Sequence, residues 1–447
     1  MTEVDACSQE QPWIQAAFLT ASALTDPICK GHELFRRIQV VGALHPESYA
    51  VTNLARKCAL FMQLVGFALL AVLTTLPGIL VRGAAASWQK QPFLYTQGKE
   101  PSKPLDSDRS FTLLSWNVCC VAGGYAISNG GVMPWRFRIE AIVDKILKQN
   151  ADVVCLYETF DTAAAHAIAE RLKAKNGYAH CYFNIGPQAV GVSSGILVAS
   201  KYQVLNPQFT PFPKETLIGR TKAAAKGVFE FDVASEGVAF ARIYATHLQH
   251  SEKRFSSTAE EAAVARNAVE REVDARNKQM NLIVGKVNAI AASTKALIIT
   301  GDLNLNDAEY KASTWKEGFT RGPPELLALE GPGYSQGFLS TTSPSYTWGG
   351  DHFCATEVAG DPPSEPQNLD HILAKKKSVA SIVTYLIPTG YDQMKFCLAS
   401  TSDHELLLTT TYLHPIDPSA PSPLANRRAA PRVLSGRRGL ASTPETT

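Results

Sequence analysis

Polar side chains recur at the ends of apolar, strand-like runs along this chain, and α/β proteins place their functional sites at such strand ends. These residues are Asn117, Glu158, His247, Asp302, Asn304, Asp370, Asp403 and His404. A single polar residue at a strand end is commonplace, but so many carboxylate, amide and imidazole groups are hard to explain as solvated turns. We therefore expect them to converge on one site.

The residue types in this set suit hydrolysis of a phosphate ester. That reaction needs a hard cation to neutralise phosphoryl oxygens and a group that takes a proton from water. Glu158 is the best candidate ligand, because Mg²⁺ prefers oxygen donors and keeps several waters. Asp302 and Asn304, close together across a turn, can address one water or phosphate. His404, oriented by Asp370, forms an Asp-His pair that can act as the base.

Apolar runs and amphipathic stretches predict how these residues are held. The strand candidates are Phe111–Val118, Val153–Tyr157, Ser194–Ala199, Gly227–Val233, Val238–Thr246, Ala296–Thr300, Leu369–Ala374 and Glu405–Tyr412. The helix candidates are Arg136–Gln149, Ala163–Lys175 and roughly Ala259–Ala292. Many short strands interleaved with a few long helices predict a four-layer α/β sandwich, in which two packed mixed sheets are flanked by helices.

A charge-free run of 24 residues begins at Cys58 and ends at Val81. The segment 58–82 is long enough to cross a bilayer, and it predicts a single-pass membrane helix; a buried helix of a soluble domain is the alternative. Around it we expect an N-terminal region, 1–57, of unknown role, a linker at 83–108, a catalytic domain at 109–413 and a disordered Pro/Ser/Ala-rich tail at 414–447.

The overall composition excludes few classes of protein. Among 447 residues, 45% are hydrophobic and the net charge is +2, so no global positive charge favours a nucleic-acid partner. The nine cysteines are scattered without a Cys-x-x-Cys pair, which argues against a zinc cluster and against a small disulfide framework.

The ordered motifs SWNV, DVVCLYE, SGILVASKY, THLQ, GDLNLN, LDHI and SDH resemble those of the endonuclease/exonuclease/phosphatase superfamily. By that resemblance Asn117 and Glu158 belong to a metal site, and Asp403 helps to hold the metal. The resemblance also implies that Asp302 and Asn304 form the GDxN pair of the site. His404 is then the general base, supported by Asp370.

Finer features are similar to neutral sphingomyelinases. In THLQHSE, His247 follows its strand directly, and in that family this histidine stabilises the phosphate or assists the leaving group. Lys226 in KGV is expected to pair with a lipid phosphate or to position a loop, although Thr221 precedes it where some relatives carry Asp. Arg276 and Gln279 match a helical Arg-x-x-Gln motif that we expect to brace the active-site loops.

The resemblance implies a magnesium-dependent phosphodiesterase, for which Mn²⁺ is a second candidate ion. Its expected substrate is sphingomyelin or a related choline phospholipid in a membrane, hydrolysed to ceramide and phosphocholine. A nuclease or an inositol-polyphosphate 5-phosphatase of the same superfamily is the nearer rival, and the neutral charge and the apolar segment disfavour nucleic acid. A catalytically idle membrane-tethered interaction module is the rival from another class.

Overall fold

The computed structural model describes most of the chain between residues 3 and 415. The described residues are 3–45, 48–121, 132–187, 190–251, 258–290, 295–321, 324–326, 347–350, 364–387, 389, 391–393 and 398–415. The predicted disordered tail therefore lies outside the described residues from position 416 onward.

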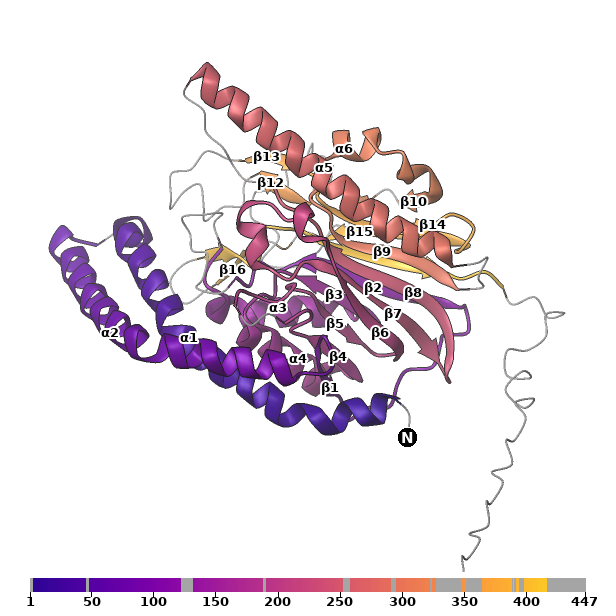
Figure 1. Ribbon diagram of the computed structural model, residues 1–447, viewed down its shortest axis with the longest axis horizontal. Coiled ribbons are helices and arrows are strands. Elements are labelled where there is room, and N and C mark those ends of the chain that lie inside the picture. Colours follow the sequence, from indigo (N-terminus) through magenta and orange to yellow (C-terminus); the bar gives the residue numbers. More distant parts are fainter. Residues whose placement is uncertain are drawn as a thin grey trace, which may run out of the picture. The chain divides into compact units, whose positions relative to one another are not determined.

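The larger sheet has eight strands in the order β1-β4-β5-β3-β2-β18-β15-β11 (Figure 1). In chain order its strands are β1 (Leu94–Gln97), β2 (Ser110–Asn117), β3 (Val153–Tyr157), β4 (His180–Phe183), β5 (Leu197–Ser200), β11 (Pro324–Leu326), β15 (Ser381–Ile387) and β18 (Leu406–Tyr412). β2 and β3 run parallel, whereas β18 runs antiparallel to β2. The sheet is therefore mixed, as predicted.

The second sheet has six strands in the order β10-β14-β9-β8-β7-β6. They are β6 (Gln203–Pro211), β7 (Gly227–Ser235), β8 (Val238–His247), β9 (Ala296–Asp302), β10 (Phe319–Arg321) and β14 (Asp370–Lys375). Two short pairs stand outside the sheets: β12 (Trp348–Gly350) with β13 (Ser364–Gln367), and β16 (Tyr391–Gln393) with β17 (Leu398–Ser400).

Helices cover the outer faces of the two sheets (Figure 1). Those of the sandwich are α3 (Trp135–Gln149), α4 (Thr162–Asn176), α5 (Ala259–Ala289) and α6 (Asp307–Ala312), with short 3-10 turns at Lys214–Thr216, Gly219–Ala223 and Trp315–Gly318. α5 begins with a capping box between Thr258 and Glu261, which satisfies main-chain N–H groups at its first turn.

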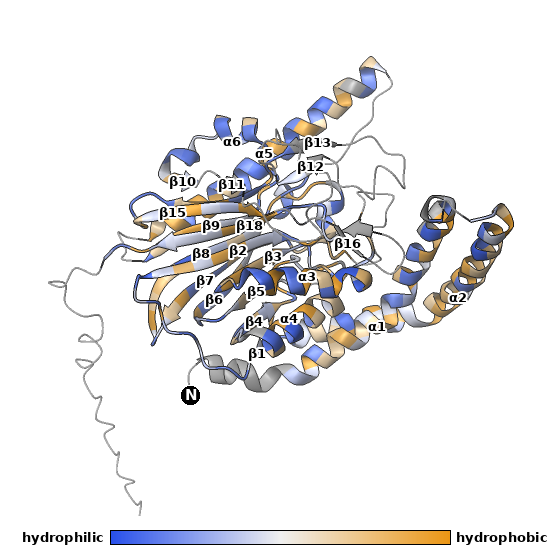
Figure 2. Ribbon diagram, turned by 180° about the vertical axis from the view of Figure 1, so that it is seen from behind, coloured by the Kyte–Doolittle hydropathy of each residue, from blue (hydrophilic) through white to orange (hydrophobic). Residues whose placement is uncertain are grey.

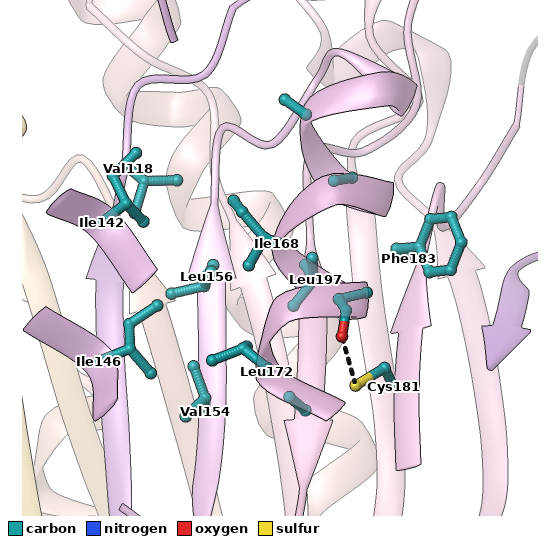
Figure 3. Packing of buried hydrophobic residues seen from close by; sticks show 14 of the residues in the cluster. Val118, Ile142, Ile146, Val154, Leu156, Ile168, Leu172, Cys181, Phe183 and Leu197 are labelled. Atoms are coloured by element: carbon teal, nitrogen blue, oxygen red, sulfur yellow. Dashed lines mark hydrogen bonds between the residues drawn. The ribbon is translucent and has the colours of Figure 1, made fainter. Parts of the chain in front are cut away.

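Three clusters of buried side chains hold these layers together. Between α3, α4 and the larger sheet, aliphatic residues such as Ile142, Leu156 and Ile168 are fully buried (Figure 3). A second cluster fills the space between the sheets, and a third lies between the smaller sheet and α5. Helix, sheet, sheet and helix therefore form the predicted four-layer sandwich.

The strands missed by sequence patterning lie mainly toward the sides of the sheets. β1 and β6 are edge strands, and the four residues of β1 leave no room for a recognisable alternation. β1 also changes the interpretation of residues 83–108. This stretch was predicted as a linker, yet it finishes α2 and then pairs antiparallel with β4.

The N-terminal region forms two long helices, α1 (Glu3–Leu44) and α2 (Ala50–Trp88), which pack against each other. The packing is close at Gly78, where an added Cβ would lie 2.8 Å from the Thr25 side chain. About two turns farther along both helices, Ile14, Phe18 and Ala85 are buried in the same cluster as residues of α3 and α4. The helix pair is therefore joined to the outer core of the sandwich.

The predicted membrane segment lies within α2. This helix is long and apolar enough to cross a bilayer, and only 6% of its most apolar window is buried. Its exposed leucines Leu69, Leu73, Leu76 and Leu80 are each more than 60% accessible, and the helix is largely apolar along its length (Figure 2). By length and composition alone, α2 could therefore cross a membrane.

Candidate active site

Strand pairing brings the predicted site residues to one edge of the sandwich. The parallel pairing of β8 with β9 sets His247 opposite Asp302. The antiparallel pairing of β14 with β9 sets Asp370 opposite Asp302 from the other side. In the larger sheet, Asn117 ends β2 beside β3, the strand that Glu158 follows. Strands of both sheets therefore end at the same place.

The catalytic base candidate is held by a short hydrogen bond. His404 precedes β18, and its Nδ1 lies 2.7 Å from Oδ2 of Asp370. Because a carboxylate only accepts, Nδ1 carries the proton and the lone pair of the neutral ring is on Nε2. Nε2 lies 3.3 Å from Nδ2 of Asn117 and 3.9 Å from Oδ2 of Asp302. The lone pair is therefore directed toward the other site residues.

Two glycines permit the close packing of this edge. A Cβ on Gly301 would lie 1.9 Å from the carbonyl oxygen of Thr246, so any other residue would separate β8 from β9. Gly195 has a φ of +75°, and its Cβ would lie 3.2 Å from Cα of Glu158. The glycines of the GDLN and SGIL motifs therefore keep His247, Asp302 and Glu158 near one another.

Three non-glycine residues at the site adopt left-handed backbone conformations. They are Glu158 with a φ of 59°, Asn304 with 50° and Cys119 with 48°. Such conformations are uncommon for residues with a side chain and concentrate at functional sites. Each follows the end of a strand, where the turn directs the neighbouring side chains inward.

The charges at this edge fit a bound cation. Donor atoms of Glu158, His247 and Asp302 lie within 4.8 Å of one another, as do those of Asp302, Asp370 and His404. Burial, together with the nearby carboxylates of Asp403 and Asp302, raises the pKa of Glu158 to about 7. Burial likewise raises the pKa of Asp370 to about 6. A cation among these carboxylates would remove that repulsion.

Buried nitrogen and oxygen atoms without hydrogen-bond partners also indicate that the site binds a ligand. Among the described residues, neither ring nitrogen of His247 has a hydrogen-bond partner, and Oδ1 of Asp370 has none. Burial and then the charge of Lys226 lower the pKa of His247 well below its ordinary value, so the ring is neutral. Buried polar atoms without partners are costly, which indicates that a ligand completes the site.

Two further candidate ligands of the cation, Asn117 and Asp403, differ in how close they lie to the site. Asn117 accepts the N–H of Cys119 on Oδ1 at 3.0 Å and donates from Nδ2 to Asp302 at 2.9 Å, so one lone pair of Oδ1 remains for a cation. Asp403 is only half-buried and is not among the residues grouped within 4.8 Å. Its charge nevertheless acts on Glu158.

Lys226 and Asn304 converge on the main chain next to His247. The ammonium of Lys226 donates to the carbonyl of Leu248, and Nδ2 of Asn304 lies 3.5 Å from the same oxygen. The N–H of Leu248 donates to the carbonyl of Asp302 at 3.0 Å. Burial lowers the pKa of Lys226 to about 8. In this structure the Lys226 ammonium therefore contacts the main chain of the loop that follows β8.

Arg276 and Gln279 of α5 hold the loop that continues from β8. Arg276 is fully buried, pairs with both carboxylate oxygens of Glu309 and donates to the carbonyl of Gln249 at 3.2 Å. Gln279 accepts the N–H of Gln249 at 2.9 Å and donates to the carbonyl of Thr216. The loop that follows His247 is thus hydrogen-bonded to α5.

A family model matches the sequence of this chain, and solved structures resemble its fold. The model of the endonuclease/exonuclease/phosphatase family matches residues 114–404, which include every predicted site residue from Asn117 to His404. The chain belongs to this family. Its members are phosphoesterases. No curated protein sequence matches the chain.

Several solved structures are similar to this chain at low sequence identity. A beta toxin variant from Staphylococcus aureus with bound magnesium ions has a TM-score of 0.50 and 18% identity, covering 68% of this chain and 100% of its own. Sphingomyelinase C from Streptomyces griseocarneus has a TM-score of 0.47 and 18% sequence identity, and the match covers 67% of this chain and 99% of that protein. Truncated TDP2 from Caenorhabditis elegans has a TM-score of 0.42 and 17% sequence identity, and the match covers 68% of this chain and 98% of that protein.

Sequence reasoning missed residues that hold the family motifs in place. Thr347 accepts the N–H groups of both Leu369 and Asp370 on its hydroxyl, each at 3.0 Å. Ser402 donates to the carbonyl of Asn117 at 2.6 Å. Arg138 is buried among main-chain carbonyls of the same region. These contacts join segments that are far apart in the chain, so a local sequence pattern could not predict them.

Proposed function

We propose that this chain is a magnesium-dependent phosphodiesterase that hydrolyses sphingomyelin, or a related choline phospholipid, to ceramide and phosphocholine. The observation that carries the proposal is the 2.7 Å pairing of His404 with Asp370 beside the Glu158, His247 and Asp302 group. A base and a cation-binding group at one edge are the two parts that phosphoester hydrolysis requires.

His404 is the proposed general base. Its Nε2 takes a proton from water, and the oxygen of that water forms a bond to phosphorus. Burial disfavours the imidazolium, but Asp370, with Asp403 and Asp302, raises the pKa of His404 well above its ordinary value. The Asp370 carboxylate thus stabilises the proton that His404 acquires.

We assign contact with the phosphate to His247 and Asn304. As attack proceeds, the bond between phosphorus and the ceramide oxygen breaks and that oxygen leaves with the electron pair. The neutral ring of His247, 3.5 Å from Asp302, offers an N–H to a phosphoryl or leaving oxygen. Asn304, whose N–H donates to Oδ1 of Asp302 at 3.0 Å, presents its amide beside them.

Glu158, with Asn117 and Asp302 beside it, supplies the oxygen donors that would hold Mg²⁺, and Asp403 adds charge to the same side of the site. A bound Mg²⁺ neutralises negative charge on the phosphoryl oxygens. Mn²⁺ accepts similar oxygen donors and is the second candidate. The residues present therefore fit the expected ion.

Contact with a membrane is the second part of the proposal, and α2 is the proposed contact. Its exposed leucines follow one another at helical spacing from Leu69 to Leu80, which leaves an apolar face for lipid. A single-pass span over 58–82 stays a prediction. α1 packs along α2 with Lys30 above the Phe67 ring and with Glu33 near Arg136, so a span requires these charges to move or to enter lipid.

The deciding experiment incubates the purified full chain with sphingomyelin, phosphatidylcholine and abasic-site DNA in parallel, with and without Mg²⁺. Phosphocholine release and strand cleavage are measured. Magnesium-dependent phosphocholine release from sphingomyelin supports the proposal. DNA cleavage with intact lipid would keep the fold and the metal site but replace the substrate, and inactivity on all three would favour an idle module.

A further inference from the structure

Arg138 is an unexpected residue on the buried face of α3. Its side chain is 1% exposed and shares that face with the fully buried Ile142, Val143 and Ile146. Long aliphatic residues fill such a face in most helices, and a buried cation is costly unless its donors are satisfied. The position of Arg138 therefore calls for a specific reason.

The hydrogen bonds of Arg138 supply that reason. Nη1 donates to the carbonyls of Val118 at 2.8 Å and Thr401 at 2.5 Å, Nη2 donates to that of Cys119 at 2.6 Å, and Nε to that of Met133 at 2.5 Å. All four acceptors are main-chain oxygens. The guanidinium thus ties one helix to two loops that are remote from each other in sequence.

Both loops carry active-site residues. Val118 and Cys119 follow Asn117, and the N–H of Cys119 fixes the Asn117 amide. Thr401 begins the turn that ends at His404, and Ser402 within it hydrogen-bonds both Asn117 and the His404 N–H. The contact between Asn117 and His404 therefore depends on two loops whose carbonyls Arg138 holds.

We propose that Arg138 is a positioning residue of the active site, which sets the metal-side Asn117 and the base His404 at their working separation through the main chain. The inference rests on the proposed phosphodiesterase function. Methionine, lysine and glutamine cannot reproduce the planar fork of donors that reaches both loops at once. Removing a supporting hydrogen bond of this kind costs about 10–100-fold in metal affinity or activity.

The test compares Arg138→Met and Arg138→Lys with Ile146→Ala, a cavity variant on the same buried face that leaves the loops untouched. Each full-length protein is assayed with sphingomyelin and with bis(4-nitrophenyl) phosphate, and Mg²⁺ binding to the metal-free protein is measured by calorimetry. We expect Arg138→Met to lower kcat about 100-fold with KM within about threefold, and to weaken Mg²⁺ binding about tenfold. Arg138→Lys should recover part of both losses, because one cationic donor remains.

Ile146→Ala should lower the melting temperature while leaving kcat and Mg²⁺ affinity near wild type. Equal losses of kcat in Ile146→Ala and Arg138→Met, or wild-type kcat and Mg²⁺ affinity in a folded Arg138→Met, would overturn the positioning role. If wild type hydrolyses neither substrate yet binds Mg²⁺, the proposed function fails while the binding comparison still tests Arg138. Wild type without Mg²⁺ binding would overturn both proposals.

Discussion

The catalytic edge and the N-terminal helix pair both bring charged side chains together, but the two regions combine those charges differently. On α1, Asp26 pairs with Lys30 at 3.3 Å and with Arg136 of α3. At the catalytic edge, Glu158, Asp302 and Asp370 gather like charges and leave buried atoms unpaired. Pairs of opposite charges hold two elements together, whereas like charges gathered at one edge favour a bound cation.

The largest expected effect is that of removing the proposed base, His404, from the catalytic edge. We expect His404→Ala to lower kcat at least about 1,000-fold, because a positioned general base contributes roughly 10²–10⁴-fold. Phosphocholine release from sphingomyelin measures it. His166→Ala, on α4 beside Glu170, is the control and should retain activity. Activity of folded His404→Ala near wild type would remove His404 from the mechanism.

Asp370→Asn should have the next largest effect. Because Asp370 raises the pKa of His404, its loss should lower that pKa, and the acidic limb of the pH profile should move to lower pH. The rate at the optimum should also fall, by about 100-fold, since Asn does not stabilise the imidazolium. A pH profile of kcat checks both effects. An acidic limb that moves to higher pH would contradict the pairing.

Glu158→Gln should stabilise the protein in the absence of metal. The pKa of Glu158 is raised from 4.5 to about 7 in the folded chain, so the unfolded chain ionises first and stability falls as the pH rises between these values. At pH 8 with EDTA, we expect the free energy of unfolding to rise by about 3 kcal/mol in the variant. At pH 4 the two proteins should unfold alike. A destabilised variant at pH 8 would show that Glu158 is already compensated.

The smallest effect concerns α2. Leu73→Ser on its exposed face should weaken binding to phosphatidylcholine vesicles about 30-fold, because burying a leucine is worth about 2 kcal/mol. Turnover of a soluble phosphodiester should not change. Thr74→Ser, an exposed neighbour, is the matched control and should bind as wild type does. Unchanged vesicle binding in Leu73→Ser would separate α2 from the membrane.

Much of the catalytic region could be read from local pattern. The apolar runs of β3 and β9 are nearly continuous because both faces of these strands are buried, and such runs mark central strands. In β8 the part-exposed Arg242 interrupts the apolar run. The motifs after them identify Glu158, His247 and Asp302, because site residues stand where strands end. The sequence pattern did not predict edge strands such as β1, because a strand of four residues is too short to show a recognisable alternation.

By itself the sequence determined the class of fold, the apolar segment within α2 and the side chains able to perform phosphoester hydrolysis, because these depend on residue type and local period. Only the tertiary structure decided that Thr347 holds Asp370, that Arg138 holds the two loops and that α1 packs on α2. These contacts join residues far apart in the chain. They arise from register and packing between elements, which no local pattern encodes.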